Sequence, residues 1–214
     1  MEPVQHLVVT GANGGLGRAL LVAFGGWQIH APSREELDVA DVGAVRGYLA
    51  DRPVDLLVYA AGMIRDAPLL KLDETNWDQI LAVNYRGAAE CAKVALSTMR
   101  ARGGGHIVFI SSRSALHPPA GQSAYATAKA ALLGLTHDLA VRHGPDNIRV
   151  NAILPGFLET RMTAAVTAIR KNQILSDHCL ERFNTPEVVA KFIRYLHDEL
   201  PHTSGQVFQL DSRV

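Results

Sequence analysis

The stretch that decides the fold is H-L-V-V-T-G-A-N-G-G-L-G, from His6 to Gly17. Its first five residues are largely apolar and β-branched, which predicts a short buried strand. Glycines follow directly, and the run from Arg18 to Phe24 then predicts a helix. Glycine lets the backbone turn tightly and approach a ligand, and a helix N-terminus offers unpaired N–H groups to an anion. A glycine-rich segment alone is often only a turn. Between a strand and a helix, it indicates a site for the pyrophosphate of a dinucleotide.

Outward from this stretch, strand-like and helix-like runs alternate along the chain. We expect further strands at 27–31, 55–59, 106–110, 148–153 and 206–210, and one cut to its tip at 37–39. We expect helices at 41–50, 76–99, 124–139 and 185–197, the first capped by Asp41 and the last by Thr185. The polar, weakly periodic run 160–182, here called the lid, suits a mobile cover over a pocket. This alternation predicts an α/β fold, a doubly wound, Rossmann-like parallel sheet, in a single domain over residues 1–214.

Composition excludes several classes of function. Hydrophobic residues make up 48% and charged residues 20% of the chain, as in an ordinary globular protein. The formal net charge is zero, so we expect neither a nucleic-acid partner nor an anionic membrane surface. Cys91 and Cys179 are isolated, which indicates reduced thiols and a cytoplasmic protein. The histidines lack metal-ligand spacing, so we expect no metal site.

A second stretch carries candidate chemistry: S-S-R-S-A-L-H-P-P-A-G-Q-S-A-Y-A-T-A-K, from Ser111 to Lys129. Tyr125 and Lys129 lie four residues apart in an expected helix and therefore share one face. We expect the lysine cation to lower the phenol pKa, which makes the pair a candidate proton donor and acceptor. Ser112 ends an expected strand, at the sheet edge where α/β proteins bind ligands, and could hydrogen-bond a carbonyl oxygen. The alternative is a surface pair without function.

Six motifs in register resemble the short-chain dehydrogenase/reductase family over nearly the whole chain. They are T-G-A-N-G-G-L-G (10–17), A-A-G (60–62), the asparagine of V-N-Y-R-G (83–87), a serine, Y-x-x-x-K and Pro155-Gly156. The resemblance implies that Tyr125 is the general acid for carbonyl reduction and that Ser112 holds the carbonyl oxygen. It implies that Lys129 binds the nicotinamide ribose. Asn84 would distort its helix and hold a water in a proton relay.

The same resemblance implies a nicotinamide cofactor held along the sheet edge. Ser33-Arg34 after the second strand favours NADP, because arginine accommodates a 2′-phosphate. Glu35 and Glu36 follow at once, so NAD stays possible. The residues expected at the cofactor are Gly11, Asn13, Gly15, Leu16, Gly17, Ser33, Arg34, Asp38, Val39, Ala60, Ala61, Gly62, Tyr125, Lys129, Pro155 and Gly156.

Three departures from the family pattern carry expectations of their own. Ala60 replaces the usual asparagine of N-A-G, so we expect a less rigid turn. Only about seven residues separate the second strand from Asp38, so the sheet is shortened between strands 2 and 3 and the adenine side is open. The usual C-terminal D-G-G reads Asp211-Ser212-Arg213, so assembly through this segment could differ.

Within the family, A-G-M-I-R-D-A-P-L-L (61–70) and P-G-F-L-E-T-R-M-T (155–163) are most similar to the 3-oxoacyl-(acyl carrier protein) reductases. This implies an acyl-thioester or small-molecule carbonyl substrate and a homodimer or homotetramer. It also admits an acyl carrier protein as partner, docked through arginines such as Arg100 and Arg102. Two alternatives stay open. One is a dehydrogenase of a small alcohol, sugar or steroid, and the other is a cofactor-sensing protein without chemistry.

Overall fold

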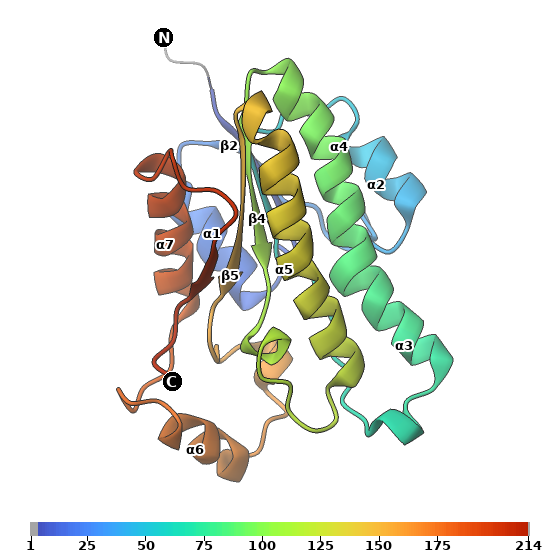
Figure 1. The fold of residues 1–214 in the computed structure, drawn as a ribbon, viewed down its shortest axis with the longest axis vertical. Helices are drawn as coiled ribbons and strands as arrows, with labels where there is room; N and C mark the ends of the chain where they lie inside the picture. Colours follow the sequence, from blue (N-terminus) through green and yellow to red (C-terminus); the bar gives the residue numbers. More distant parts are fainter. Residues whose placement is uncertain (1–3, 214) are drawn as a thin grey trace.

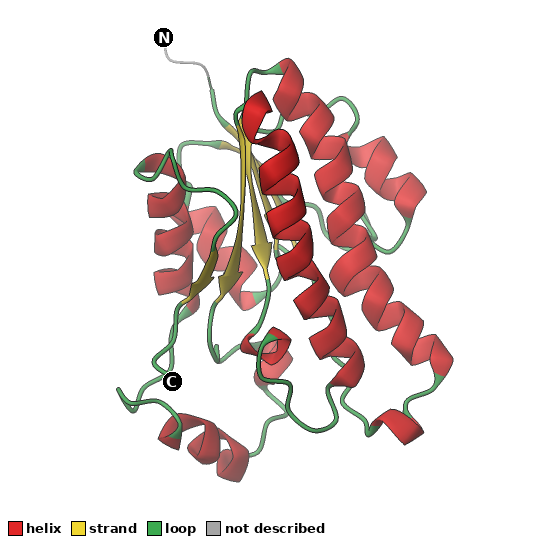
Figure 2. Cartoon of the chain, viewed as in Figure 1, coloured by secondary structure: helices red, strands yellow, loops and turns green. Residues whose placement is uncertain are grey.

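The computed structural model describes residues 4–213 and contains a six-stranded parallel sheet (Figures 1 and 2). The strand order is β2-β1-β3-β4-β5-β6. The parallel α/β prediction is therefore confirmed, and all carboxyl ends of the strands share one edge. The strands are β1 (His6–Thr10), β2 (Gln28–His30), β3 (Leu56–Tyr59), β4 (Gly105–Ile110), β5 (Ile148–Leu154) and β6 (Val207–Gln209).

Helices cover both faces of the sheet (Figure 1). One face packs against α1 (Gly15–Ala23) and α7 (Pro186–Asp198). The other packs against α2 (Val42–Leu49), α4 (Gly87–Ala101) and α5 (Ser123–His143). Successive residues of a strand point to opposite faces of the sheet. In β3, Leu56 and Val58 pack on the side of α1 and α7, whereas Leu57 and Tyr59 pack on the side of α4. A sheet buried on both sides explains why the strands read as continuous apolar runs.

The expected strand tip at 37–39 is wrong, although the shortening itself is confirmed. Leu37 and Val39 are buried in the core against α2, but they lie in a loop, and β2 is the edge strand next to β1. A parallel strand beyond β2 would need a crossover connection of roughly a dozen residues or more. Only residues 31–36 lie between β2 and this loop, so the chain cannot cross over and return.

Other expectations hold with changes of detail. Asp41 caps α2 by accepting from the N–H groups of Gly43 and Ala44, and Thr185 caps α7 by accepting from Val188 N. The helix expected at 76–99 is divided into α3 (Glu74–Leu81), a π-helical turn η2 (Ala82–Arg86) and α4. The lid contains a 3-10 turn η5 (Arg161–Thr163) and the helix α6 (Ala168–Ser176), which lies beyond the carboxyl ends of the strands (Figure 1).

Candidate active site

The structure brings Ser112, Tyr125 and Lys129 together at the carboxyl edge of the sheet. Ser112 follows β4 in extended conformation (φ −155°, ψ 153°) and accepts a hydrogen bond from Ser114 N over 3.2 Å. Tyr125 and Lys129 lie one turn apart near the start of α5. The Ser112 side chain lies close enough to the Tyr125 phenol to lower its pKa. Two hydroxyls that converge in this way can hold one carbonyl oxygen between them.

Lys129 is buried and held by the end of β4. Its Nζ donates to Ile110 O over 2.8 Å, and its own carbonyl oxygen accepts from Ser111 Oγ over 2.8 Å. Burial penalises the ammonium form, so the pKa of Lys129 is lowered to about 8. Ser111 carried no role in the sequence interpretation. Its place directly before Ser112, at the end of a buried strand, was the only signal for it.

The pKa of Tyr125 differs from expectation. Burial raises the pKa of the phenol above its usual value, the Ser112 hydrogen bond opposes this rise, and the Asp66 carboxylate adds to it. The Lys129 Nζ lies 5.7 Å from the centre of the tyrosine ring and is bonded to a backbone carbonyl. The prediction that the Tyr125 pKa is lowered by Lys129 is therefore wrong for the protein alone, because burial is the largest cause and raises this pKa.

Asn84 lies in the π-helical turn η2 and is fully buried. Its Nδ2 donates to Ile80 O (3.0 Å) and Met63 O (2.8 Å), and its Oδ1 accepts from Met63 N (3.3 Å). The side chain therefore joins the distorted helix to the loop after β3. A Cβ built on Gly62 would lie 2.9 Å from Asn84 Oδ1 and 3.7 Å from Lys129 Nζ. Asn84 and Lys129 consequently face the same point, and only glycine leaves it open.

The glycine turn provides a cradle that fits a pyrophosphate. Gly11 has φ +69°, and a Cβ there would lie 2.8 Å from Ala60 O. A Cβ on Gly17 would lie 2.4 Å from Gly11 O, so each residue must be glycine for the turn to close. Gly14 occupies the N-cap of α1 and has no side chain with which to cap it. The first N–H groups of α1 are thus left for an anion. Asn13 is exposed beside them and Leu16 is buried in the core.

The predicted adenine side forms one loop after β2. The Arg34 side chain is 84% exposed and lies 3.5 Å from Asp38 Oδ2. Asp38 Oδ1 accepts from Ala40 N over 3.0 Å, and Ser33 Oγ accepts from Glu36 N over 3.3 Å. Arg34 therefore stands on the surface where a 2′-phosphate could reach it. Val39, in contrast, is buried with its backbone oxygen against Gly87.

The turn at 60–62 is held by a residue that sequence reasoning missed. Thr10 Oγ1 accepts from Ala60 N over 3.2 Å and from Ala61 N over 3.1 Å. Thr10 is fully buried at the end of β1. The turn expected to be less rigid because Ala60 replaces asparagine is therefore tied to β1 through a side chain. A buried threonine directly before the glycine turn was the available signal.

The lid covers the space between the glycine turn and the Lys129 region. The Thr160 Cγ2 atom lies 2.7 Å from where a Cβ on Gly15 would be. The Met162 Cε atom lies 3.8 Å from where a Cβ on Gly62 would be. Neither residue was singled out from sequence, because the lid lacks periodicity. Pro155-Gly156 lies three residues before the lid, with Gly156 at φ +83°.

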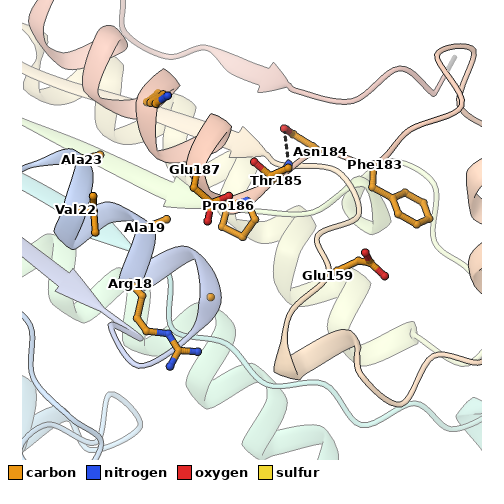
Figure 3. Close-up of a pocket in the computed structure, with 12 residues that line it drawn as sticks. Arg18, Ala19, Val22, Ala23, Glu159, Phe183, Asn184, Thr185, Pro186 and Glu187 are labelled. Atoms are coloured by element: carbon orange, nitrogen blue, oxygen red, sulfur yellow. Dashed lines mark hydrogen bonds between the residues drawn. The ribbon is translucent and has the colours of Figure 1, made fainter.

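A hollow of about 860 Å³ lies next to this site, between α1 and α7 (Figure 3). Figure 3 shows Ala19 and Val22 of α1 on one side and Pro186 and Glu187 of α7 on the other. The hollow borders the glycine turn at Gly15. Ser112, Tyr125 and Lys129 are not among the described residues that line it. It therefore flanks the candidate site.

The arginines expected to receive a carrier protein are already engaged. Arg100 Nη2 donates to Asp146 Oδ2 over 2.7 Å, and Arg102 makes two bonds, of 2.9 and 3.0 Å, to the Asp55 carboxylate. The Arg100 guanidinium also lowers the pKa of Asp146. Each arginine therefore lies beside an acid from a distant part of the chain, and a carrier protein would have to compete with that acid. Within residues 4–213 we find no group of three or more metal-ligating side chains and no helix that is long and apolar enough to cross a membrane.

Comparisons with known proteins agree with this geometry. The family model described as enoyl-(acyl carrier protein) reductase matches residues 36–212. A 3-oxoacyl-[acyl-carrier-protein] reductase of Thermotoga maritima is 38% identical over 159 residues, which cover 74% of this chain and 65% of that protein. This chain thus spans just under two thirds of that relative. The acetoacetyl-CoA reductase of a Synechocystis species is 30% identical over 96% of this chain and 94% of its own length.

A solved structure extends the likeness to nearly the whole chain. It is assigned as an NAD(P)-dependent gluconate 5-dehydrogenase of Beutenbergia cavernae and contains NADP at low occupancy. The TM-score is 0.90 at 30% identity, over 97% of this chain and 95% of that one. The family model covers most of the chain and the structural match includes the sheet and both helical layers. The chain therefore belongs to the short-chain dehydrogenase/reductase family of NAD(P)-dependent oxidoreductases.

Proposed function

We propose that this protein is an NADPH-dependent carbonyl reductase that acts on 3-oxoacyl thioesters. The observation that carries the proposal is the convergence of the Ser112 and Tyr125 hydroxyls beside the buried Lys129, at the edge where the glycine turn opens. A bound nicotinamide would supply a hydride to the carbonyl carbon. The reduction consumes one hydride and one proton, so the protein has to supply that proton to the oxygen.

Tyr125 is the proposed proton donor. Its raised pKa keeps the phenol protonated near neutrality, which suits a group that gives its proton to the carbonyl oxygen. Ser112 would donate a hydrogen bond to the same oxygen and hold the carbonyl in place. Lys129, with a pKa of about 8, exchanges protons near neutrality and is the proposed route by which Tyr125 recovers its proton. Asn84 would hold the loop at Met63 in register with Lys129.

The proposed cofactor is NADP, with NAD as the alternative. Gly11, Gly15 and Gly17 would hold the pyrophosphate at the uncapped N-terminus of α1. Arg34 supports NADP because its exposed guanidinium has only a 3.5 Å contact with Asp38 and could turn to a 2′-phosphate. Asp38 supports NAD, because its carboxylate is 41% exposed and could accept from a ribose hydroxyl. The net preference rests on the greater exposure of Arg34.

The proposed substrate class follows from two of the relatives above, which are named as a 3-oxoacyl-[acyl-carrier-protein] reductase and an acetoacetyl-CoA reductase. A coenzyme A thioester or a short carrier-free thioester fits this chain better than docking through Arg100 and Arg102, which are paired. We therefore assign the acyl carrier protein second place as a partner. We also propose a homodimer or homotetramer, which light scattering of the purified protein would test.

One experiment tests the function directly. Purified protein is given NADPH with acetoacetyl-CoA, and loss of the reduced nicotinamide is followed by absorbance. We expect turnover with this substrate and much slower turnover with NADH. The gluconate 5-dehydrogenase match favours a second candidate, a dehydrogenase of sugar acids. Turnover of gluconate with NADP, without reduction of the thioester, would replace the first proposal with the second.

A further inference from the structure

The Pro155-Gly156 turn, which directly follows β5, contacts residues far along the chain. A Cβ built on Gly156 would lie 2.7 Å from the Cβ of Asp211. The side chain of Asn184 donates to Pro155 O over 3.0 Å and to Leu210 O over 2.8 Å. The turn is therefore backed by Asp211 and tied by Asn184 to the segment that follows β6.

Asp211 is a buried carboxylate whose charge is balanced mainly by one neighbour. Its side chain is 1% exposed, and its Oδ2 lies 2.7 Å from Arg213 Nε and 2.5 Å from Arg213 Nη2. Gln209 Nε2 donates to Oδ1 over 2.9 Å, and the buried His178 ring places Nε2 at 3.8 Å from Oδ2. A buried charge is tolerated only when it is paired and hydrogen-bonded. Arg213 is therefore the main partner of the carboxylate that is buried against Gly156.

The same segment also holds the end of the lid. His178 and Arg213 form an isolated antiparallel bridge. Ser212 O accepts from Cys179 N over 3.1 Å, and Ser212 Oγ accepts from Leu180 N over 3.3 Å. The start of the lid carries Thr160 and Met162 over the cofactor site, as described above. The Pro155-Gly156 turn, which lies shortly before the lid, and residues 178–180 near the end of the lid therefore both contact residues 209–213, here called the clasp.

We propose that the Asp211–Arg213 pair is a positioning element for the proposed reductase. The pair holds the Pro155-Gly156 turn in place through Asp211 and holds the end of the lid through Arg213. Thr160 and Met162 therefore stay over the cofactor site. Neither Asp211 nor Arg213 touches the reacting groups. The kinetic consequence rests on the proposed function, whereas the fastening of the lid does not depend on it.

The test compares Arg213→Ala with a matched control, Arg102→Ala. Arg102 also makes a two-bond contact with an aspartate, but at the opposite end of the sheet. Two measurements need no turnover: cleavage of the folded protein by trypsin within the lid, and NADPH affinity by fluorescence. Trypsin can cut the lid at Arg161, Arg170, Lys171 and Arg182. We expect lid cleavage to become about tenfold faster and NADPH binding about tenfold weaker in Arg213→Ala, since charged hydrogen bonds of this kind commonly have that effect. Both should stay unchanged in Arg102→Ala.

Two further variants keep the test decisive. Arg213→Lys retains the charge but not the paired contact, so it should recover part of the lid protection. If Arg213→Ala leaves Asp211 unpaired and fails to fold, the double variant Asp211→Asn/Arg213→Gln removes both charges and takes its place. Faster lid cleavage without any reductase activity would support the clasp and count against the proposed function. Unchanged cleavage and NADPH affinity in a folded Arg213 variant would overturn the clasp, even if reductase activity is found.

Discussion

Gly62→Ala is the sharpest test of the proposed site, because a single methyl group would enter the point that Asn84 and Lys129 share. The added Cβ would lie 2.9 Å from Asn84 Oδ1, 3.7 Å from Lys129 Nζ and 3.8 Å from Met162 Cε. Gly62 does not have a positive φ, so alanine fits its backbone conformation. Any effect therefore comes from the crowded side chains.

The expected size follows from the bonds that hold Asn84. Carbon and oxygen atoms pack at about 3.5 Å, so Oδ1 has to retreat by about 0.6 Å. Asn84 cannot retreat freely, because Met63 and Ile80 hold it through three hydrogen bonds. Loss of one such buried bond costs about 1–3 kcal/mol, which lowers the melting temperature by about 4–8 °C for a loss near 2 kcal/mol. A shift of this kind at a catalytic group should reduce kcat roughly 10- to 100-fold.

The assay combines thermal unfolding with steady-state reduction of acetoacetyl-CoA by NADPH. Gly47→Ala is the control: it lies within α2, and a Cβ there meets nothing within 4 Å. Alanine in an open helical position should stabilise the protein by about 0.5–1 kcal/mol and leave kcat unchanged. If Gly62→Ala keeps both the kcat and the melting temperature of the unchanged protein, Asn84 and Lys129 do not share the site as argued.

Three further predictions address the proton donor, the cofactor and acid stability. Tyr125→Phe should lower kcat at least about 100-fold and keep NADPH binding, measured by fluorescence, because only the proton donor is lost; near-normal reduction would refute its role. Arg34→Ala should raise the KM for NADPH about tenfold and leave that for NADH unchanged, and an equal change in both would contradict the 2′-phosphate contact. Burial lowers the pKa of His106 well below its usual value and that of its stacked neighbour His197 to about 4. The unfolded chain then binds more protons between about pH 4 and 6.5, so the free energy of unfolding falls as the pH drops through that window, by about 3 kcal/mol for His197. Urea unfolding at several pH values should show that the free energy of unfolding falls less steeply in His197→Phe than in the unchanged protein. An equally steep fall in both would contradict the role given to His197.

Much of the fold follows from local patterns that can be recognised in the sequence. The run His6–Thr10, the caps Asp41 and Thr185, and the alternation of strands with helices each depend on neighbouring residues, so they could be predicted. The strand tip at 37–39 failed for a different reason. Leu37 and Val39 are apolar because they fill the core beneath α2, and an apolar pattern cannot distinguish that role from a strand.

In the candidate site, too, local motifs could be predicted and long-range contacts could not. The positions of Asn84, Ser112, Tyr125 and Lys129 could be singled out because each belongs to a short motif. Thr10 also opens a motif, but its contacts with the turn at 60–62, like the contact of Met162 near Gly62, depend on residues that meet only in the folded chain. The pairing of Arg100 with Asp146 was equally hidden.

By itself the sequence determined where the six strands of the sheet lie, which turn must be glycine-rich and which side chains share a helical face, since these depend on the spacing of near neighbours; it did not exclude the false strand at 37–39. Only the tertiary structure decided how deeply each group is buried and which distant group lies beside it. Burial and the neighbouring groups set the direction of the Tyr125 pKa shift and the lowered pKa of Lys129, and the fold brings Arg100 to Asp146. Burial and charge pairing act through space, and spacing along the chain does not encode them directly.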